Sequence, residues 1–221
     1  MPPSIFARHS SEIDWCETNY LHSEYVAEYY NTISNVSFLL VGPLMMYLLH
    51  PYACKRTLMV HGVWILFTVI GLVSIYYHMT LSFFGQLLDE LSILWVICLG
   101  YAIWFPRKYF PRFIETRSQF GMVILITAVI STLLSFVKPT INAYVLNSIA
   151  FHILYVLWKE IRKHIFICLT VGHINTVFAY FDAQYEISEC PLQVQYWPFK
   201  SRHFGLPYLA ITKSKEPKKI C

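Results

Sequence analysis

Long apolar blocks, separated by short polar stretches, dominate the pattern of this 221-residue chain. Crossing the hydrocarbon core of a bilayer takes roughly 20 mostly apolar residues in an α-helix. Six blocks approach this length, at about 33–49, 57–77, 87–105, 119–137, 140–158 and 165–181. None alternates apolar and polar residues as the strands of a transmembrane barrel do. Because backbone groups in lipid must bond within their own segment, the pattern predicts an all-α polytopic membrane protein with six apparent transmembrane helices.

The same pattern divides the chain into an N-terminal segment (1–32), a transmembrane helical domain (33–181) and a C-terminal tail (182–221). Composition agrees, because 56% of the residues are hydrophobic and only 14% are charged, against about 25% charged in a typical soluble domain. The net charge of +4 comes from basic residues at span ends and in the tail. We therefore expect the lipid bilayer as a partner and no nucleic acid.

Charged residues between the blocks predict the orientation. Acidic residues predominate before the first block: Glu12, Asp14, Glu17, Glu24 and Glu28. Basic residues follow the first, third and fifth blocks: Lys55, Arg56, Arg107, Lys108, Arg112, Arg117, Lys159, Arg162 and Lys163. Cytoplasmic loops collect Lys and Arg, so the N-terminal segment is expected in the lumen and odd-numbered spans are expected to exit into the cytosol.

The tail does not fit six spans. A sixth span would leave residues 182–221 in the lumen, although this tail is basic. It also ends in Lys218-Lys219-Ile220-Cys221, which is either a plain basic C-terminus or a dilysine signal for retrieval to the endoplasmic reticulum, read from the cytosol. An odd number of spans would place the tail there. The expected location is the endoplasmic reticulum membrane.

Polar residues at the ends of two neighbouring blocks are candidates for chemistry, because ionisable side chains inside spans are costly. Ser74 and His78 lie one turn apart on one helix face. Asp89-Glu90 opens the next block after a ten-residue connection, so His78 and Asp89 are expected at the same membrane face. An imidazole beside a carboxylate suits either a metal ligand with a base or a hydrogen-bonded packing pair.

The N-terminal segment holds a second group of polar residues, in the run Asp14-Trp15-Cys16-Glu17-Thr18-Asn19 and at Glu28. Carboxylate and amide oxygens in a short irregular run are the ligands that calcium requires, with backbone carbonyls completing the shell. The glycine and ligand spacing of an EF-hand are absent. The residues alone leave two interpretations open, a calcium site or an acidic solvated loop.

The remaining intramembrane histidines, His61, His152 and His173, have no nearby acid or second histidine at helical spacing. We expect them to bond to backbone or neighbouring side chains. The six cysteines show no paired spacing, so neither a zinc ribbon nor a disulfide scaffold is indicated.

Taken together, these motifs resemble the alkaline ceramidase family over nearly the whole chain. The opening Asp14-Trp15-Cys16-Glu17-x-Asn19, followed by Ala27-Glu28-Tyr29-Tyr30-Asn31-Thr32-Ile33-Ser34-Asn35, is similar to the start of the family. Further similar motifs are Ser74-x-x-x-His78, Leu87-Leu88-Asp89-Glu90, Asn142-Ala143-Tyr144, Gln195-Tyr196-Trp197-Pro198 and Gly205-Leu206-Pro207-Tyr208.

The resemblance implies a seven-helix intramembrane amidase that cleaves ceramide to sphingosine and a fatty acid with the help of Zn²⁺. It implies that His78 is a zinc ligand, that Asp89 is a base facing the zinc-bound water, and that Ser74 stabilises the developing oxyanion. It also implies a Ca²⁺ site formed by Asp14, Trp15 (through its carbonyl), Glu17, Asn19 and Glu28.

The family's other two zinc ligands form a His-x-x-x-His pair at the start of its seventh helix, and this chain has no such pair. By resemblance, His164 stands at the second position of the pair, whereas the first is occupied by Glu160. The missing stretch is on the order of forty residues, enough for one span and its connections, and would contain the partner that the family gives to Cys16. A span starting at His164 would begin on the membrane face opposite His78 and could not join it at a metal unless the spans rearranged. An active hydrolase and an inactive shortened form therefore both remain open.

Two alternatives belong to other functional classes. The chain could be a non-catalytic membrane protein that binds lipid or calcium, which the missing zinc ligand favours. It could also be a hormone receptor of the progestin and adiponectin type, which has a similar Ser, His, Asp and His-x-x-x-His arrangement. The N-terminal Asp-Trp-x-Glu-x-Asn segment argues against the receptor.

Overall fold

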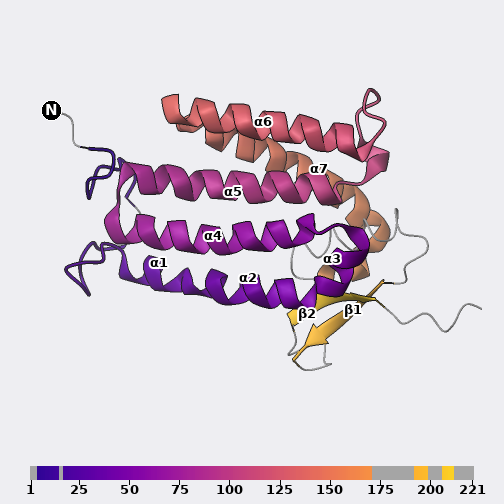
Figure 1. Cartoon of the computed structure of the whole chain (residues 1–221), viewed down its shortest axis with the longest axis horizontal. Coiled ribbons are helices and arrows are strands. Elements are labelled where there is room, and N and C mark those ends of the chain that lie inside the picture. Colours follow the sequence, from indigo (N-terminus) through magenta and orange to yellow (C-terminus); the bar gives the residue numbers. More distant parts are fainter. Residues whose placement is uncertain (1–3, 15–16, 171–191, 199–205, 212–221) are drawn as a thin grey trace, which may run out of the picture.

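The computed structural model describes residues 4–14, 17–170, 192–198 and 206–211. Its main body is a bundle of long antiparallel helices (Figure 1). The elements are α1 (Tyr29–Ser34), α2 (Val36–Leu48), α3 (His50–Arg56), α4 (Met59–Thr80), α5 (Phe83–Trp104), the 3₁₀ turn η1 (Arg107–Tyr109), α6 (Arg117–Val137), α7 (Thr140–Thr170), β1 (Leu192–Trp197) and β2 (Leu206–Ile211).

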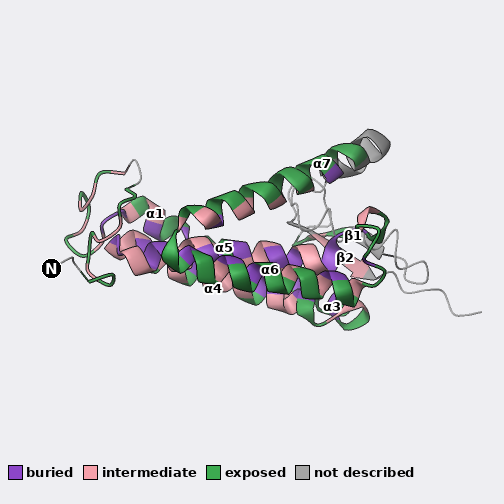
Figure 2. Ribbon diagram, turned by 90° about the horizontal axis from the view of Figure 1, so that it is seen from above, coloured by how far each residue is buried: buried purple, intermediate pink, exposed green. Residues whose placement is uncertain are grey.

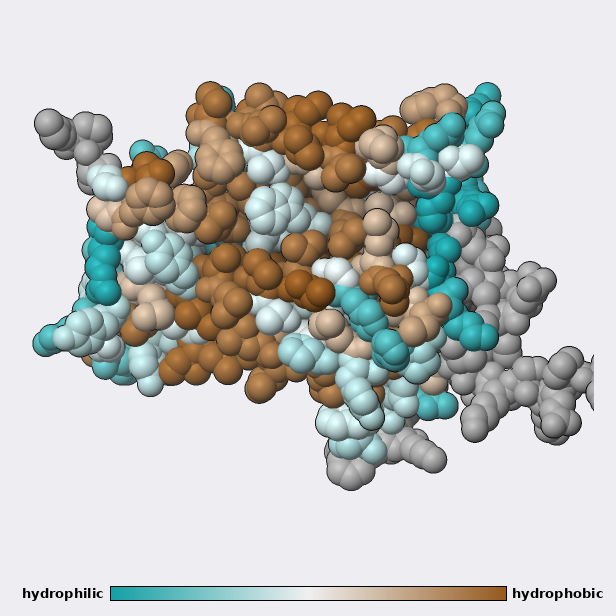
Figure 3. Space-filling model, in the orientation of Figure 1, coloured by the Kyte–Doolittle hydropathy of each residue, from teal (hydrophilic) through white to brown (hydrophobic). Residues whose placement is uncertain are grey.

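The bundle has two distinct ends (Figure 1). The α1 end carries the N-terminal segment, the α4–α5 turn and the start of α7. The α3 end carries α3, the loop between α5 and α6, and the β1–β2 hairpin. A broad hydrophobic band lies between the two ends, which are more hydrophilic (Figure 3). This distribution is the one expected of helices that cross a bilayer.

Four segments are long and apolar enough to span a membrane: Tyr29–Leu48, Met59–Thr80, Phe83–Trp104 and Arg117–Val137. The prediction of an all-α membrane protein is therefore confirmed. The first span is formed by α1 and α2 in succession, since Asn35 between them keeps helical backbone angles. The apolar part of α7, Thr140–Val156, is shorter than the four.

The structure corrects the predicted boundary between the fifth and sixth spans. A break was expected near residues 159–164, where the chain becomes charged, but α7 continues as one 31-residue helix to Thr170. Residues 140–170 contain neither Gly nor Pro, and Lys, Glu and Arg are good helix formers. A loss of hydropathy therefore does not end this helix. The rest of the sixth block, 171–181, lies outside the described residues.

The connection between the second and third spans is also shorter than predicted. In place of ten residues, only Leu81 and Ser82 separate α4 from α5. Leu81 adopts a left-handed conformation (φ 49°), and the Ser82 side chain accepts a hydrogen bond from the Gly85 amide. Gly85 is needed at this position, because a Cβ there would lie 3.0 Å from the Tyr77 Cα. His78 and Asp89 therefore lie inside helices that are joined by a tight turn.

The hydrophobic core is concentrated at the α3 end, where α2, α3, α4 and α5 meet. Met45, Tyr52, Trp64 and Trp104 are buried together there, and the Trp104 indole donates to the Tyr52 hydroxyl at 3.1 Å. Figure 2 shows that the outward faces of α6 and α7 are largely exposed, as expected for helices that face lipid.

The tail contributes an antiparallel hairpin, in which Leu192 pairs with Ile211 and Trp197 with Leu206. The alternation of Leu192, Val194 and Tyr196 with glutamines is typical of a strand, so the predicted C-terminal tail contains regular structure. β2 packs against α3 and α2. The hairpin therefore lies at the end that carries Lys55 and Arg56.

Candidate metal and catalytic site

The α4–α5 turn brings the polar side chains of the second and third spans together at the α1 end. The Asn35 amide donates to the Ser74 hydroxyl at 2.9 Å, and the Ser74 side chain in turn hydrogen-bonds the Asp89 carboxyl. His78 lies close enough to Asp89 for their charges to interact. Three spans thus contribute to one buried polar cluster. Asn35 ends one of the motifs shared with the family, but no role in the site was predicted for it, because the motif alone does not show which side chains it meets.

Glu28 lies at the centre of this cluster rather than only in the N-terminal segment. One of its carboxylate oxygens contacts Nδ1 of His78, and the Glu28 side chain is completely buried. The Asn31 amide donates to the same oxygen at 3.4 Å. A carboxylate facing Nδ1 favours the proton on that nitrogen and leaves Nε2 with a lone pair. His78 is therefore oriented to offer Nε2 to a ligand.

Backbone hydrogen bonds hold the N-terminal segment against the α4–α5 turn. The Glu28 amide donates to the His78 carbonyl at 3.0 Å, and the amides of His9 and Ser11 donate to the carbonyls of Thr80 and Leu81. The Tyr77 hydroxyl donates to the Ile13 carbonyl at 2.9 Å. These contacts tie the segment to the helices that carry Ser74, His78 and Asp89.

Glu17 caps the start of α1. Its two carboxylate oxygens accept the amides of Tyr30 and Asn31, at 2.7 and 3.0 Å. Desolvation opposes the charged form, but these bonds, with a further one from the Tyr29 amide, hold the pKa of the Glu17 carboxyl below its ordinary value of 4.5. Glu17 is thus a carboxylate whose charge is stabilised by backbone donors.

Asn19 and Asp14 form a second pair of oxygen donors nearby. The Asn19 amide donates to the Asp14 carboxylate at 2.8 Å. The Asn19 Oδ1 is buried and accepts no hydrogen bond from the part of the chain that the structure describes. A buried oxygen without a donor is an acceptor that a cation can use. Trp15 and Cys16 lie outside the described residues.

His164 is not brought to this cluster. It lies in α7, which starts at the α1 end and runs to the α3 end (Figure 1). Val156 of α7 belongs to the same buried cluster as Phe105, just past the end of α5. The rise of α5 from Asp89 to Phe105 is about 24 Å, and α7 continues beyond that level before His164. The His164 side chain lies outside the described part of the chain, but its backbone is at the wrong end to meet His78.

The described residues therefore do not fit a zinc ion held by three protein ligands. No group of three or more His, Cys, Asp or Glu side chains among them could hold a metal. His78 is the one histidine of the α1-end cluster within the described ranges. Asp14, Glu17, Asn19 and Glu28 supply the kind of oxygen ligand that calcium prefers, and the Asn19 oxygen has no donor among the described residues. Within the same residues the three carboxylates do not form a group that could hold a metal.

Asn142 is a polar residue of this end to which no role was predicted. It lies in the first turn of α7 and is fully buried. Neither its amide nitrogen nor its oxygen has a hydrogen-bond partner among the described residues. Such a group is costly unless something bonds it. Its burial could not be deduced from the sequence, in which it follows Pro139 at a helix start.

The other intramembrane histidines bond to neighbouring side chains, as expected. Nδ1 of His50 lies 3.1 Å from Nε2 of His61, and His152 bonds the Tyr101 hydroxyl. His173 lies outside the described residues.

Comparison with known proteins gives consistent matches. A family model described as Ceramidase matches residues 7–164. The chain is 46% identical to alkaline ceramidase 1 of Mus musculus over 96% of this chain and 94% of the mouse protein. It is also 46% identical to alkaline ceramidase 1 of Homo sapiens, over 95% and 97% of the two chains. Alkaline ceramidase of Drosophila melanogaster is 32% identical over 91% and 88%.

These alignments also contain a gap in this chain. The alignment with the mouse protein covers 258 positions, more than the 221 residues of the whole chain. The match to the family model ends at residue 164.

Proposed function

The chain belongs to the ceramidase family, and from this premise we propose that its chemistry is zinc-dependent hydrolysis of the amide bond of ceramide to sphingosine and a fatty acid. We propose further that the 221-residue form does not carry out this reaction, because it contributes one histidine to the zinc site. The observation that carries the proposal is the opposite placement of the two candidate ligands: His78 at the α1 end, with Ser74, Asp89 and Glu28, and His164 on the far part of α7.

The roles of the cluster residues follow from their contacts. Ser74 receives a hydrogen bond from Asn35 and bonds Asp89, so its hydroxyl is held where it can turn towards an oxyanion. Asp89 is a half-buried carboxylate that can accept a proton from a nucleophilic water. Glu28 orients His78 through Nδ1.

The N-terminal segment is proposed as a calcium site, formed by Asp14, the Trp15 carbonyl, Glu17, Asn19 and Glu28. The proposal is supported by the oxygen chemistry of these groups and by the unpaired Asn19 oxygen within the described residues. When bound, calcium would tie the segment to the start of α1. Calcium binding without hydrolysis is thus the activity expected of this shortened form.

The endoplasmic reticulum membrane is the proposed location, with the α1 end in the lumen and the α3 end in the cytosol. The Lys and Arg residues at the α3 end support this orientation. The hairpin of the tail packs at the same end. The dilysine pattern at residues 218–219 would then face the cytosol, where it can be read.

The test compares two purified proteins in detergent. One is this chain, and the other has the absent segment of a 46% identical relative inserted at the gap. Zinc content and sphingosine release from ceramide are measured for both. We expect zinc and activity only in the restored form, and loss of both when His78→Ala is introduced there. His61→Ala is the matched control, since His61 lies outside the cluster and should leave both unchanged.

Two outcomes would contradict the proposal. Activity in the 221-residue chain would mean that another residue replaces the missing histidine. If the restored form held no zinc, or if His78→Ala left its activity unchanged, the proposal of zinc-dependent amide hydrolysis would be wrong. Calcium binding by the 221-residue chain, lost in Asn19→Ala, would support its separate role.

A further inference from the structure

Three side chains at the α3 end form a hydrogen-bonded array that lies outside the candidate metal and catalytic site. The Sγ of Cys54 lies 3.5 Å from Nε2 of His50, one turn earlier on α3. On the other side of the same ring, Nδ1 of His50 lies 3.1 Å from Nε2 of His61, near the start of α4. The array therefore runs from a thiol through two imidazoles and joins α3 to the second span.

The two contacts of His50 define its role. With its proton on Nδ1, His50 donates to Nε2 of His61 and offers the lone pair of its own Nε2 to the Cys54 thiol. A nucleophile beside a base, with the base oriented by a third group, is the arrangement that activates a cysteine. His61 acts through the ring of His50 and is therefore a positioning residue.

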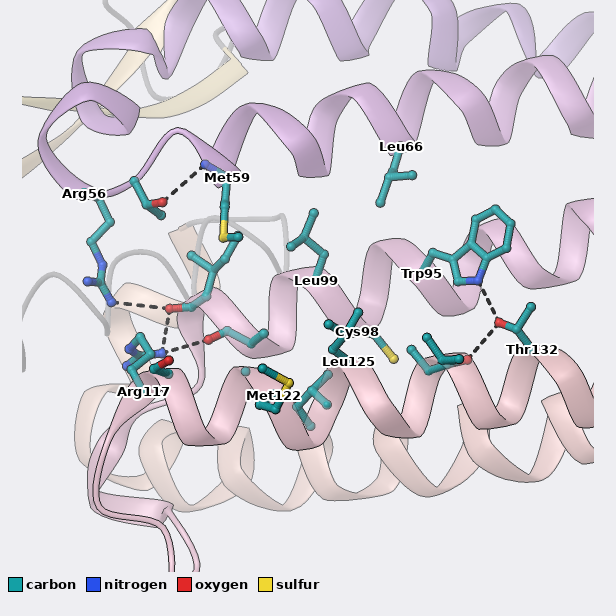
Figure 4. Close-up of a pocket in the computed structure, with 18 of the residues that line it drawn as sticks. Arg56, Met59, Leu66, Trp95, Cys98, Leu99, Arg117, Met122, Leu125 and Thr132 are labelled. Carbon is teal, nitrogen blue, oxygen red and sulfur yellow. Dashed lines mark hydrogen bonds between the residues drawn. The ribbon is translucent and has the colours of Figure 1, made fainter.

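The Cys54 thiol is also accessible, as a reactive cysteine must be. It is free and exposed, whereas Tyr52 and Ala53, its neighbours on α3, are buried against the bundle. Cys98 is the other cysteine whose side chain the structure describes. It is buried and lines an apolar groove between α4, α5 and α6 (Figure 4). The two thiols therefore differ in access, and Cys54 is the one that a reagent can reach.

A pocket of about 680 Å³ lies beside the two imidazoles. His50 and His61 line it, together with residues 46–48 at the end of the first span and Tyr208 of the hairpin. The part that comes from α2 is apolar, whereas the hairpin adds the Tyr208 hydroxyl. A molecule that approaches His50 through this pocket therefore meets an apolar surface on the membrane side and a polar surface on the other.

The position of the array relative to the bilayer indicates the chemical class of its substrate. α3 lies between the first and second spans and follows directly on α2, so Cys54 is a juxtamembrane cysteine. Cysteines in this position are typical acceptors of fatty acyl groups. A long-chain acyl thioester inserts its chain into one leaflet and leaves its thioester at the membrane surface. Its reactive carbon therefore lies at the level of the Cys54 thiol.

We propose that Cys54 is an S-acylation site that accepts the acyl group of a long-chain acyl-coenzyme A. Nε2 of His50 takes the thiol proton while Sγ of Cys54 attacks the thioester carbonyl carbon. The bond from that carbon to the sulfur of the coenzyme then breaks, and His50 gives the proton to the departing thiolate. The products are a thioester at Cys54 and free coenzyme A, with no change of oxidation state. The site is at the opposite end of the bundle from His78 and is independent of the proposed amidase chemistry.

The experiment uses the full chain, purified in detergent and incubated with palmitoyl-coenzyme A. Peptide mass spectrometry locates the acyl group, and its release by neutral hydroxylamine, which restores the free thiol, identifies a thioester. We expect the acyl group on Cys54, and none at this position in Cys54→Ser. Cys98→Ser is the matched control, because it removes a buried thiol, and it should leave the rate of Cys54 acylation unchanged.

Replacement of His50 distinguishes a base from a merely structural contact. His50→Gln retains a polar side chain but cannot take up the thiol proton, so it should slow acylation of Cys54 about a hundredfold, within the usual range for a general base. In His50→Ala, imidazole added to the buffer should restore part of the rate, because the position is exposed. His22→Ala, which removes an exposed histidine at the α1 end, is the control and should leave the rate unchanged.

Three results would overturn the proposal: acylation of other cysteines with none on Cys54, an unchanged rate in His50→Gln, or no effect of imidazole on His50→Ala. Modification of Cys54 by glutathione disulfide but not by palmitoyl-coenzyme A would assign the thiol to redox chemistry and would also overturn it. The melting temperature of each variant confirms that it is folded.

Discussion

Glu28 and His78 are fifty residues apart in the sequence, and their side chains meet at the α1 end. The Glu28 side chain has no exposed surface, and that of His78 is 12% exposed. A buried polar group that loses its partner costs about 1–3 kcal/mol. The stability of this end therefore depends on a contact between the N-terminal segment and α4.

Replacing Glu28 tests that dependence. Glu28→Ala should lower the free energy of unfolding by about 1–3 kcal/mol, because His78 and Asn31 both lose a bond to the carboxylate. Glu28→Gln retains an acceptor oxygen and should cost less. Thermal unfolding in detergent measures both. Glu24→Ala, at an exposed position of the same segment, should change nothing, and an equal loss there would contradict the prediction.

Glu17 makes the stability of the α1 end depend on pH. Its pKa is lowered by the backbone donors of α1, so the folded state favours the ionised carboxylate. This stabilisation is complete above the ordinary value of 4.5 and disappears as the pH falls through the lower folded-state pKa. Thermal midpoints of the parent and Glu17→Gln should therefore differ at neutral pH and converge in acid. Glu12→Gln, an exposed carboxylate of this segment, is the control and should show no such convergence.

At the scale of helices, the packing of α2 on α4 depends on one glycine. A Cβ on Gly42 would lie 2.1 Å from the Thr68 hydroxyl oxygen and 3.0 Å from the Trp64 carbonyl oxygen. Small residues at such contacts allow membrane helices to approach closely. Thr68 itself donates to the Trp64 carbonyl, which fixes the hydroxyl in place.

Two glycine substitutions should therefore have opposite effects. Gly42→Ala should destabilise the bundle by roughly 1–3 kcal/mol, since α2 must move away from α4. Gly121→Ala meets empty space and should be neutral or stabilising by up to about 1 kcal/mol, as alanine favours the helix. Unfolding midpoints of the two variants decide this. A Gly42→Ala protein as stable as the parent would show that the two helices are not in close contact.

The sequence predicts helices better than it predicts their ends. Hydropathy located the four helices that are long and apolar enough to span a membrane, because the cost of unpaired backbone in lipid leaves helices as the solution. It placed a helix boundary near Lys159 that the structure does not have. Charged residues are unfavourable in lipid, but they do not break a helix. It also missed the Leu81–Ser82 turn, whose geometry depends on one left-handed residue and a Ser82 cap.

The candidate site was predictable only in part. The spacing of Ser74 and His78, and the nearby Asp89, follow from helix periodicity and a short connection. The contact of Glu28 with His78 depends on how the N-terminal segment folds back on the turn, which no periodicity encodes. Asn35 and Asn142 were missed for the same reason, since their burial depends on tertiary packing.

At the scale of the whole molecule, the two ends of the bundle differ in their basic residues. This difference predicts which end lies on the cytosolic side. Cys54 has a free, exposed thiol at the α3 end. In intact vesicles from the endoplasmic reticulum, a membrane-impermeant maleimide should label a variant in which Cys54 is the single remaining cysteine. A variant with its single cysteine at Glu24→Cys, at the α1 end, should be labelled only after the vesicles are opened. The reverse pattern would invert the proposed orientation.

The position of Glu28 also has a thermodynamic consequence. The Glu28 carboxylate contacts His78 and also belongs to the set of oxygen donors proposed for calcium. Calcium binding therefore alters the bond between Glu28 and His78, and ligand binding at His78 alters the bond between Glu28 and calcium. Reciprocity requires that the two effects be equal: the factor by which calcium changes the affinity of His78 for its ligand is the factor by which that ligand changes the affinity for calcium. If calcium binds as proposed, a change in its concentration at the α1 end would alter the ligand affinity of the His78 imidazole through the Glu28 side chain.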